Sequence, residues 1–178
     1  YNIDARKNCD VFFAMNYFGY KAPEMEHYIA TFKKKGKIVI EDITHSLLND
    51  SPASQYSDYI VASLRKWFAI PTGGLLCKRE GKLLVSVEKS GDLAVQDKIE
   101  AMKKKYLFLS GKINDKKEYL SENAKFDNQL IHMDCKVGID HMSAGIIMNL
   151  DIGKVKKQRK ENALILHEAL KNNPNISM

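Results

Sequence analysis

The segment from residue 11 to residue 40 constrains the fold more than any other part of the chain. Val11–Met15 is a short, continuous apolar run, which is typical of a strand buried on both faces of a parallel sheet. Pro23 then begins a stretch with helical spacing of apolar residues that ends at Gly36, and Lys37–Ile40 is a second strand. Strand, helix and strand within about 30 residues form a βαβ unit. Its strands must pair in parallel through a right-handed crossover.

The later part of the chain adds strands and then helices. We therefore expect an α/β fold in which a partly parallel sheet with flanking helices is followed by further helices. The predicted elements are strands at Tyr59–Ala62 and Gly74–Cys77, lysine-rich helical stretches from about Ala94 to Tyr119 and from Glu122 to Met133, a buried run or strand at Ser143–Leu150, and a final helix from Ile152 to Asn172.

The length and composition fit one domain, or one domain and part of another. The 178 residues are 44% hydrophobic, which is enough to bury a core. We expect a hinge at Ser86–Gly91, so that residues 1–90 belong to a larger domain and residues 91–178 form a helical remainder.

The charge of the chain does not predict a nucleic-acid partner. The formal net charge is +6, but much of the excess lies in lysine runs such as 33–35 and 103–105 on predicted helix surfaces. Such runs are usually solvated, and they are not interleaved with aromatic residues as in nucleic-acid-binding surfaces.

The cysteines and histidines indicate reduced thiols and no metal site. The three cysteines are far apart, which fits neither a disulfide framework nor a metal cluster. His132 with Asp134, and His141 with Asp140, could be ligand pairs, but both lack further partners and are better explained as surface polar residues. Since no apolar run approaches the roughly 20 residues that cross a bilayer, we expect a cytoplasmic protein without a membrane partner.

Polar residues follow or end the predicted strands. Asn16, Asp42 and Ser63 would meet at the carboxyl edge of a parallel sheet, where ligands bind. Lys66 comes three residues after Ser63, and Gly73–Gly74 begins the next strand. Because an ammonium group is costly to bury alone, Lys66 needs either access to solvent or a chemical role. Each residue alone has an ordinary explanation as a strand cap or surface side chain, but the ordered set favours a site.

This ordered set resembles the fold-type-I pyridoxal-phosphate (PLP) enzymes. In that superfamily a strand ending in Asp is followed by a strand ending in Ser-x-x-Lys and by a glycine-rich strand; here Asp42 and Lys66 are separated by 24 residues, which is similar to the family. The stretch VIEDITHSL, with His45 three residues after Asp42, is most similar to the DegT/DnrJ/StrS sugar-aminotransferase group. The short spacing from Ser63 to Lys66 is closer to aspartate aminotransferase and class V patterns, so an amino-acid substrate stays open as an alternative to a nucleotide sugar.

The resemblance implies a role for each residue. Lys66 would form the Schiff base with the cofactor aldehyde and relay a proton, and both roles need a lowered pKa. Asp42 would keep the pyridine nitrogen protonated, so that the cofactor acts as an electron sink. By the same resemblance, Ser63 would address the phosphate, His45 the ring or its phenolic oxygen, and Asn16, with Gly19 three residues on, that same oxygen.

The resemblance covers nearly the whole chain, but the chain covers only about the middle of the family. A glycine-rich phosphate-binding helix start and a ring-stacking residue would both precede Asn16. Arg159 and Asn162 resemble an Arg-x-x-Asn pattern at the start of the small C-terminal domain. We therefore expect a middle fragment of a large PLP-binding domain, with the beginning of the small domain, from a parent homodimer.

The resemblance implies a PLP-dependent aminotransferase that moves an amino group from an amino-acid donor to a keto acceptor, which could be a sugar. One alternative is a catalytically inactive PLP-fold module that binds partners or regulates. The other is an ordinary doubly wound nucleotide-binding domain, but Asn16–Tyr20 does not match G-x-G-x-x-G and the chain has no P-loop.

Overall fold

The computed structural model describes residues 3–4, 6, 8–20, 22–87, 95–133 and 136–175. The chain divides into two compact units, Tyr1–Ile147 and Met148–Met178. The hinge expected at Ser86–Gly91, and with it the boundary between residues 90 and 91, falls largely outside the described residues and stays a prediction.

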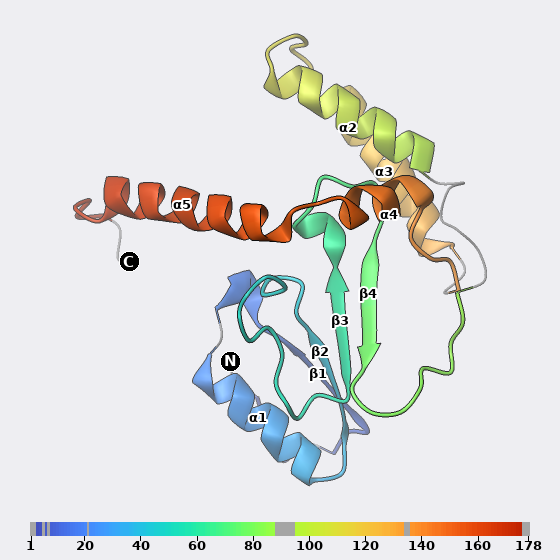
Figure 1. The fold of residues 1–178 in the computed structure, drawn as a ribbon, viewed down its shortest axis with the longest axis vertical. Helices are drawn as coiled ribbons and strands as arrows, with labels where there is room; N and C mark the ends of the chain where they lie inside the picture. The colour runs from blue at the N-terminus through green and yellow to red at the C-terminus, as the bar shows by residue number, and fades with distance from the viewer. Residues whose placement is uncertain are drawn as a thin grey trace. The chain divides into compact units, whose positions relative to one another are not determined.

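The first unit begins with the predicted βαβ arrangement. Strand β1 (Val11–Met15) is followed by helix α1 (Pro23–Lys34) and strand β2 (Ile38–Asp42), and the two strands pair in parallel (Figure 1). Pro23 is suited to the first helical position because its fixed φ is helical. Gly36 adopts a φ of +71° just beyond the helix, a conformation that side chains other than glycine rarely adopt.

Two more strands complete a mixed sheet. Strand β3 (Tyr59–Ser63) pairs in parallel with β2, and β4 (Gly74–Lys78) pairs antiparallel with β3, giving the order β1-β2-β3-β4. All four strands lie where the sequence predicts them. The expectation of an α/β fold with a partly parallel sheet is therefore confirmed.

The core lies between α1 and one face of the sheet. Side chains alternate between the faces of a strand, and Phe12 and Ala14 pack with α1. The rings of Phe12 and Phe32 stack with centroids 4.3 Å apart. The other members of this core are Ala22, Met25, Ile29 and Val39.

On the opposite face of the sheet, several apolar side chains are open to solvent in the described part of the chain. Val11 and Phe13 of β1, Ile38 of β2 and Leu76 of β4 are all exposed on it. Parallel strands are usually covered on both faces. This exposed apolar surface is the kind that a further layer of protein would bury.

A buried carboxylate anchors the long loop between β2 and β3. Glu41 is fully buried, and its Oε2 accepts hydrogen bonds from the Ser54 amide at 2.7 Å and the Ser57 hydroxyl at 2.6 Å. The Ser54 hydroxyl also donates to Glu26 of α1 at 2.6 Å, and Arg79, just after β4, donates to the carbonyls of Ser54 and Ser57. The loop is thereby tied to α1, β2 and the end of β4.

The helical region differs in detail from its prediction. A break at residues 110–116 separates α2 (Val95–Leu109) from α3 (Lys117–Ile131), so the predicted end of the first helix at Tyr119 is wrong. Gly111, with a φ of +70°, and Asp115, whose carboxylate accepts the Lys117 amide at 2.8 Å, explain the break. The predicted starting residue Ala94 lies outside the described residues.

The prediction of a buried run or strand at residues 143–150 is wrong in both forms, because the segment is helical up to Met148 and most of its residues are exposed or half-buried. Helix α4 (His141–Met148) occupies this segment, and its start is capped by Asp140, whose Oδ1 accepts the Ser143 amide at 2.8 Å. In the second unit, α5 (Ile152–Leu170) confirms the predicted final helix. None of the helices in the described ranges is long and apolar enough to cross a membrane.

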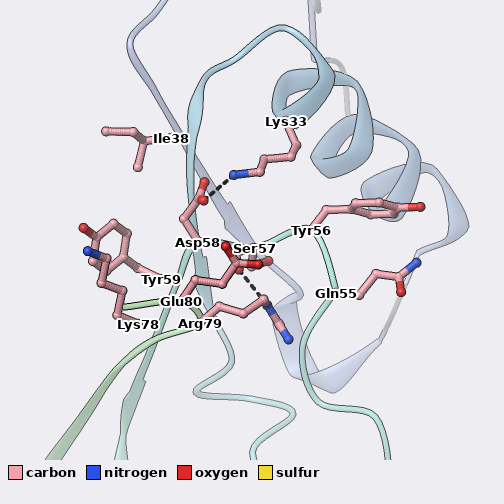
Figure 2. Close-up of a pocket in the computed structure, with 10 residues that line it drawn as sticks. All are labelled: Lys33, Ile38, Gln55, Tyr56, Ser57, Asp58, Tyr59, Lys78, Arg79 and Glu80. Carbon is pink, nitrogen blue, oxygen red and sulfur yellow. Dashed lines mark hydrogen bonds and ion pairs between the residues drawn. The ribbon is translucent and has the colours of Figure 1, made fainter. Parts of the chain in front are cut away.

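Asp58, just before β3, joins two neighbouring elements. Its carboxylate accepts hydrogen bonds from the Lys33 ammonium of α1 and from the Val39 amide of β2, the latter at 2.9 Å; Figure 2 shows the contact with Lys33. Burial raises the pKa of Asp58, but the bonds from Lys33 and Val39 and the charges of Lys33 and Lys78 outweigh it and hold the pKa below its ordinary value.

Replacing Asp58 with asparagine should lower the free energy of unfolding by about 1–2 kcal/mol at neutral pH, because charge-assisted hydrogen bonds are lost. Since the folded pKa is depressed, this stabilisation exists above the unfolded pKa and disappears as the pH falls through the folded one. The difference between wild type and variant in urea denaturation should therefore shrink as the pH falls below the ordinary aspartate pKa of about 3.9. Glu80→Gln removes a nearby exposed carboxylate as a control, and an equal effect there would contradict this role for Asp58.

Candidate functional site

The predicted site residues lie at the ends of the parallel strands. Asn16 directly follows β1, Asp42 ends β2 and Ser63 ends β3. Asp42 is in register with Met15 on one side and with Val61 on the other. Because β4 runs antiparallel, its first residue, Gly74, lies opposite Ser63. The sheet therefore brings these polar residues and the double glycine to one edge.

Thr44 connects two of the predicted residues. Its amide donates to Asp42 Oδ1 at 2.8 Å, and its hydroxyl oxygen accepts the Ser63 amide at 2.8 Å. The Trp67 indole donates to the Thr44 carbonyl. The ends of β2 and β3 are thus held in a fixed relation through one side chain and its backbone.

Asp42, Thr44 and Ser63 line one cavity of about 1140 Å³. Gly73–Gly74 forms part of its wall, and Gly73 has a φ of +136°, which a residue with a side chain rarely adopts. The rest of the lining is mainly apolar and comes from the segment after β4, from α3 and from the residues that follow α3, with members such as Leu83, Val85, Phe126, Leu130 and Met133. The cavity therefore combines a polar strand edge with an apolar wall, which is the usual character of a small-molecule site.

Two polar side chains in this cavity wall can form further hydrogen bonds. Within the described chain, Asp42 Oδ2 and the Ser63 hydroxyl have no hydrogen-bond partner. Asp42 is therefore free to accept a further bond, and Ser63 to donate one.

Lys66 is not brought into this cavity wall. It ends a single 3-10 turn, η2 (Leu64–Lys66), and is exposed, while its neighbour Arg65 lines the cavity. Of the two explanations for a lysine at this place in the sequence, access to solvent is the one the structure shows. Phe68 is buried and Trp67 is half-buried, so both side chains contribute to packing.

Asn16 and His45 lie around a second turn, η1 (Tyr17–Gly19). His45 Nδ1 accepts the Phe18 amide at 2.9 Å, and the Phe18 ring stacks on the imidazole with centroids 5.8 Å apart. A Cβ at Gly19 would lie 2.6 Å from the His45 carbonyl oxygen, which explains the glycine. Asn16 is only 3% exposed, and its Oδ1 has no partner among the described residues. Neither Asn16 nor His45 belongs to the cavity wall.

A second hydrogen-bond network, centred on Asp140, holds Thr72, the residue before the double glycine. Asp140 is fully buried, so its interpretation as a surface residue is wrong. Its Oδ2 accepts the Thr72 hydroxyl, and the Thr72 amide donates to the Ser143 hydroxyl at 3.2 Å. Burial raises the pKa of Asp140, but hydrogen bonds from Ser143 and Thr72 outweigh this and lower it. The turn before Gly73 is therefore bound to the start of α4.

His132 and His141 are exposed as expected, and Asp134 lies outside the described residues. No group of three or more His, Cys, Asp or Glu side chains in the described ranges could hold a metal ion.

A smaller cavity of about 260 Å³ lies at the opposite ends of the strands (Figure 2). Its wall includes the first residues of β2 and β3, Ile38 and Tyr59. Lys33 pairs there with Asp58, and Arg79 donates to the Ser57 carbonyl at 2.9 Å. Lys33 and Arg79 therefore stabilise the fold, which makes this cavity a weaker candidate for a functional site than the larger one.

Comparisons of the chain with protein-family models, with curated proteins and with solved structures found no match.

Sequence reasoning missed Thr44, Thr72 and Phe126. Thr44 could have been predicted from the sequence, because it lies between the candidate site residues Asp42 and His45 and follows the end of a strand. Thr72 and Phe126 reach the cavity through tertiary packing with segments far away in the sequence. For these two no local pattern exists.

Replacing Asp140 with alanine should lower the free energy of unfolding by about 2 kcal/mol or more, because a helix cap and a buried hydrogen bond are both lost. Chemical denaturation with far-UV circular dichroism would measure it. The matched control is Asp151→Ala, since Asp151 caps α5 on the surface by accepting the Lys154 amide at 2.9 Å. A larger loss at Asp151 than at Asp140 would contradict the structural role given to the buried network.

Proposed function

We propose that the chain is part of a fold-type-I PLP-dependent aminotransferase, similar to the DegT/DnrJ/StrS group, that transfers an amino group from an amino-acid donor to a keto acceptor such as a keto sugar. The observation that supports it best is the meeting of Asp42 and Ser63, from adjacent parallel strand ends, in the wall of one large cavity beside Gly73–Gly74. The two strand ends and the double glycine of the family-like sequence pattern thus lie beside one another in space.

The available groups suit the cofactor in chemical type. Asp42 has a carboxylate oxygen free to accept the pyridine N–H, and holding that proton is the role of such a carboxylate. Ser63 has a hydroxyl free to donate to a phosphate oxygen. When bound, PLP supplies an electron sink for negative charge that develops next to the amino group.

Lys66 is the amine in this proposal. It would hold the cofactor aldehyde and, once released, move a proton through its Nζ. Its exposed position at the end of η2 requires its flexible stem to turn towards the cavity that Arg65 lines. His45 and Asn16 lie outside the wall, so their proposed contacts with the ring require the η1 turn to approach the bound molecule.

The open sheet face supports the further proposal that the chain belongs to a larger domain and that the parent protein is a homodimer. Exposed Val11, Phe13, Ile38 and Leu76 need a covering layer. Cys9 and Cys77 are free thiols, which supports a cytoplasmic location.

A second candidate is a catalytically inactive PLP-fold module that binds or regulates a partner. The exposed position of Lys66 favours this candidate, because a lysine in contact with solvent needs no catalytic role. The exposed apolar side chains of the sheet also favour it, because such a surface can bind a partner.

Titration of the full-length gene product with PLP would separate the two candidates by visible absorbance. The aminotransferase proposal predicts a new band in wild type and in Lys112→Ala, and its loss in Lys66→Ala. It also predicts that Asp42→Asn weakens PLP binding about tenfold, as loss of a charge-assisted hydrogen bond would. No band in wild type, or an unchanged band in Lys66→Ala, would overturn the proposal and favour the inactive module.

A further inference from the structure

Three cationic side chains gather between η2 and α2. Arg65 and Lys66 belong to η2, and Lys98 lies on the second turn of α2. In the described part of the chain none of the three forms an ion pair, although lysines elsewhere, such as Lys33 and Lys104, do. Among the described residues, their positive charge is therefore not neutralised by an ion pair.

Phe126 of α3 holds two of these cations in place. Its ring is fully buried, with Arg65 Cζ 5.5 Å and Lys98 Nζ 5.1 Å from the ring centroid. Such contacts attract a cation to the face of the ring without neutralising its charge. Lys98 Nζ also donates to Asn123 Oδ1 at 2.6 Å. Both cations are thus oriented by neutral partners on one helix.

The electrostatics around Lys98 reflect the excess charge. Burial lowers the pKa of Lys98, and the charges of Arg65, Lys105 and Lys66 lower it further. The charge of Asp127 acts in the opposite direction and raises the pKa of Lys98. A site with several cations and little compensation attracts anions.

This cluster borders the large cavity. Arg65 and Phe126 are both part of its wall, together with Asp42 and Ser63. The rest of the wall beside them is largely apolar, as at Leu130 and Met133. An acidic group of a molecule in the cavity would find a guanidinium there, which is suited to paired hydrogen bonds with an oxyanion.

We propose that Arg65, supported by Lys98 and the Phe126 ring, binds the oxyanion, carboxylate or phosphate, of a small acidic molecule that enters the cavity. This anion site consists of Arg65, Lys98 and Phe126, whereas the proposed cofactor anchors are Asp42 and Lys66. It goes beyond the proposed aminotransferase function and holds whether or not the cavity takes PLP.

The test measures the binding of succinate and of inorganic phosphate to the full chain without PLP. Isothermal calorimetry and the fluorescence of Trp67, the single tryptophan, give the affinities. Wild type should bind at least one of the two anions; succinate alone indicates a carboxylate ligand, and phosphate alone a phosphate ligand. Arg65→Gln and Lys98→Gln should each weaken binding about tenfold, as expected for a charge-assisted hydrogen bond or a nearby charge.

Lys112→Gln removes an exposed lysine just after α2 and should leave the affinity unchanged. Arg65→Lys keeps the positive charge but lacks the planar guanidinium, so its anion affinity should lie between the affinities of wild type and Arg65→Gln. If a variant fails to fold by circular dichroism, the wild type still gives a test, because its affinity should decrease with added sodium chloride.

The proposal is overturned if wild type binds neither anion, if its affinity is independent of salt, or if Lys112→Gln weakens binding as much as Arg65→Gln. Since PLP is absent from this experiment, its failure leaves the aminotransferase proposal standing, and a missing PLP band leaves this one standing.

Discussion

Parallel pairing of β1, β2 and β3 is the constraint on which the rest of the structure depends. It follows from the βαβ crossover through α1, and it places Asn16, Asp42 and Ser63 at one edge of the sheet. The antiparallel β4 then adds Gly74 beside Ser63. A shift of one residue in this register would turn the side chain of Asp42 to the other face, where α1 packs.

Two sets of hydrogen bonds give that edge its detailed geometry. Thr44 binds the ends of β2 and β3 together, and the buried Asp140 binds the turn at Thr72 to the start of α4. The cavity between them joins a polar edge to an apolar wall that includes Phe126. The same aromatic ring orients Arg65, so packing and charge at this place have a common support.

The strands and α1 could be predicted because their signals are local: apolar runs, a proline start and a glycine stop lie within each segment. The helical region was less predictable, since Gly111 breaks a pattern whose apolar spacing continues on both sides. Asp42 and Ser63 could be expected at one edge from topology alone. The exposure of Lys66 and the burial of Asp140 could not, because both depend on contacts between segments distant in the sequence.

In the proposed function, the amine of Lys66 at the end of η2 serves the cavity at the strand ends. Borohydride reduction of the full-length gene product with bound PLP, followed by peptide mass spectrometry, tests it most directly. The account predicts one pyridoxyl-modified peptide, with the modification on Lys66. Modification spread over exposed lysines such as Lys112, or none at all, would contradict it.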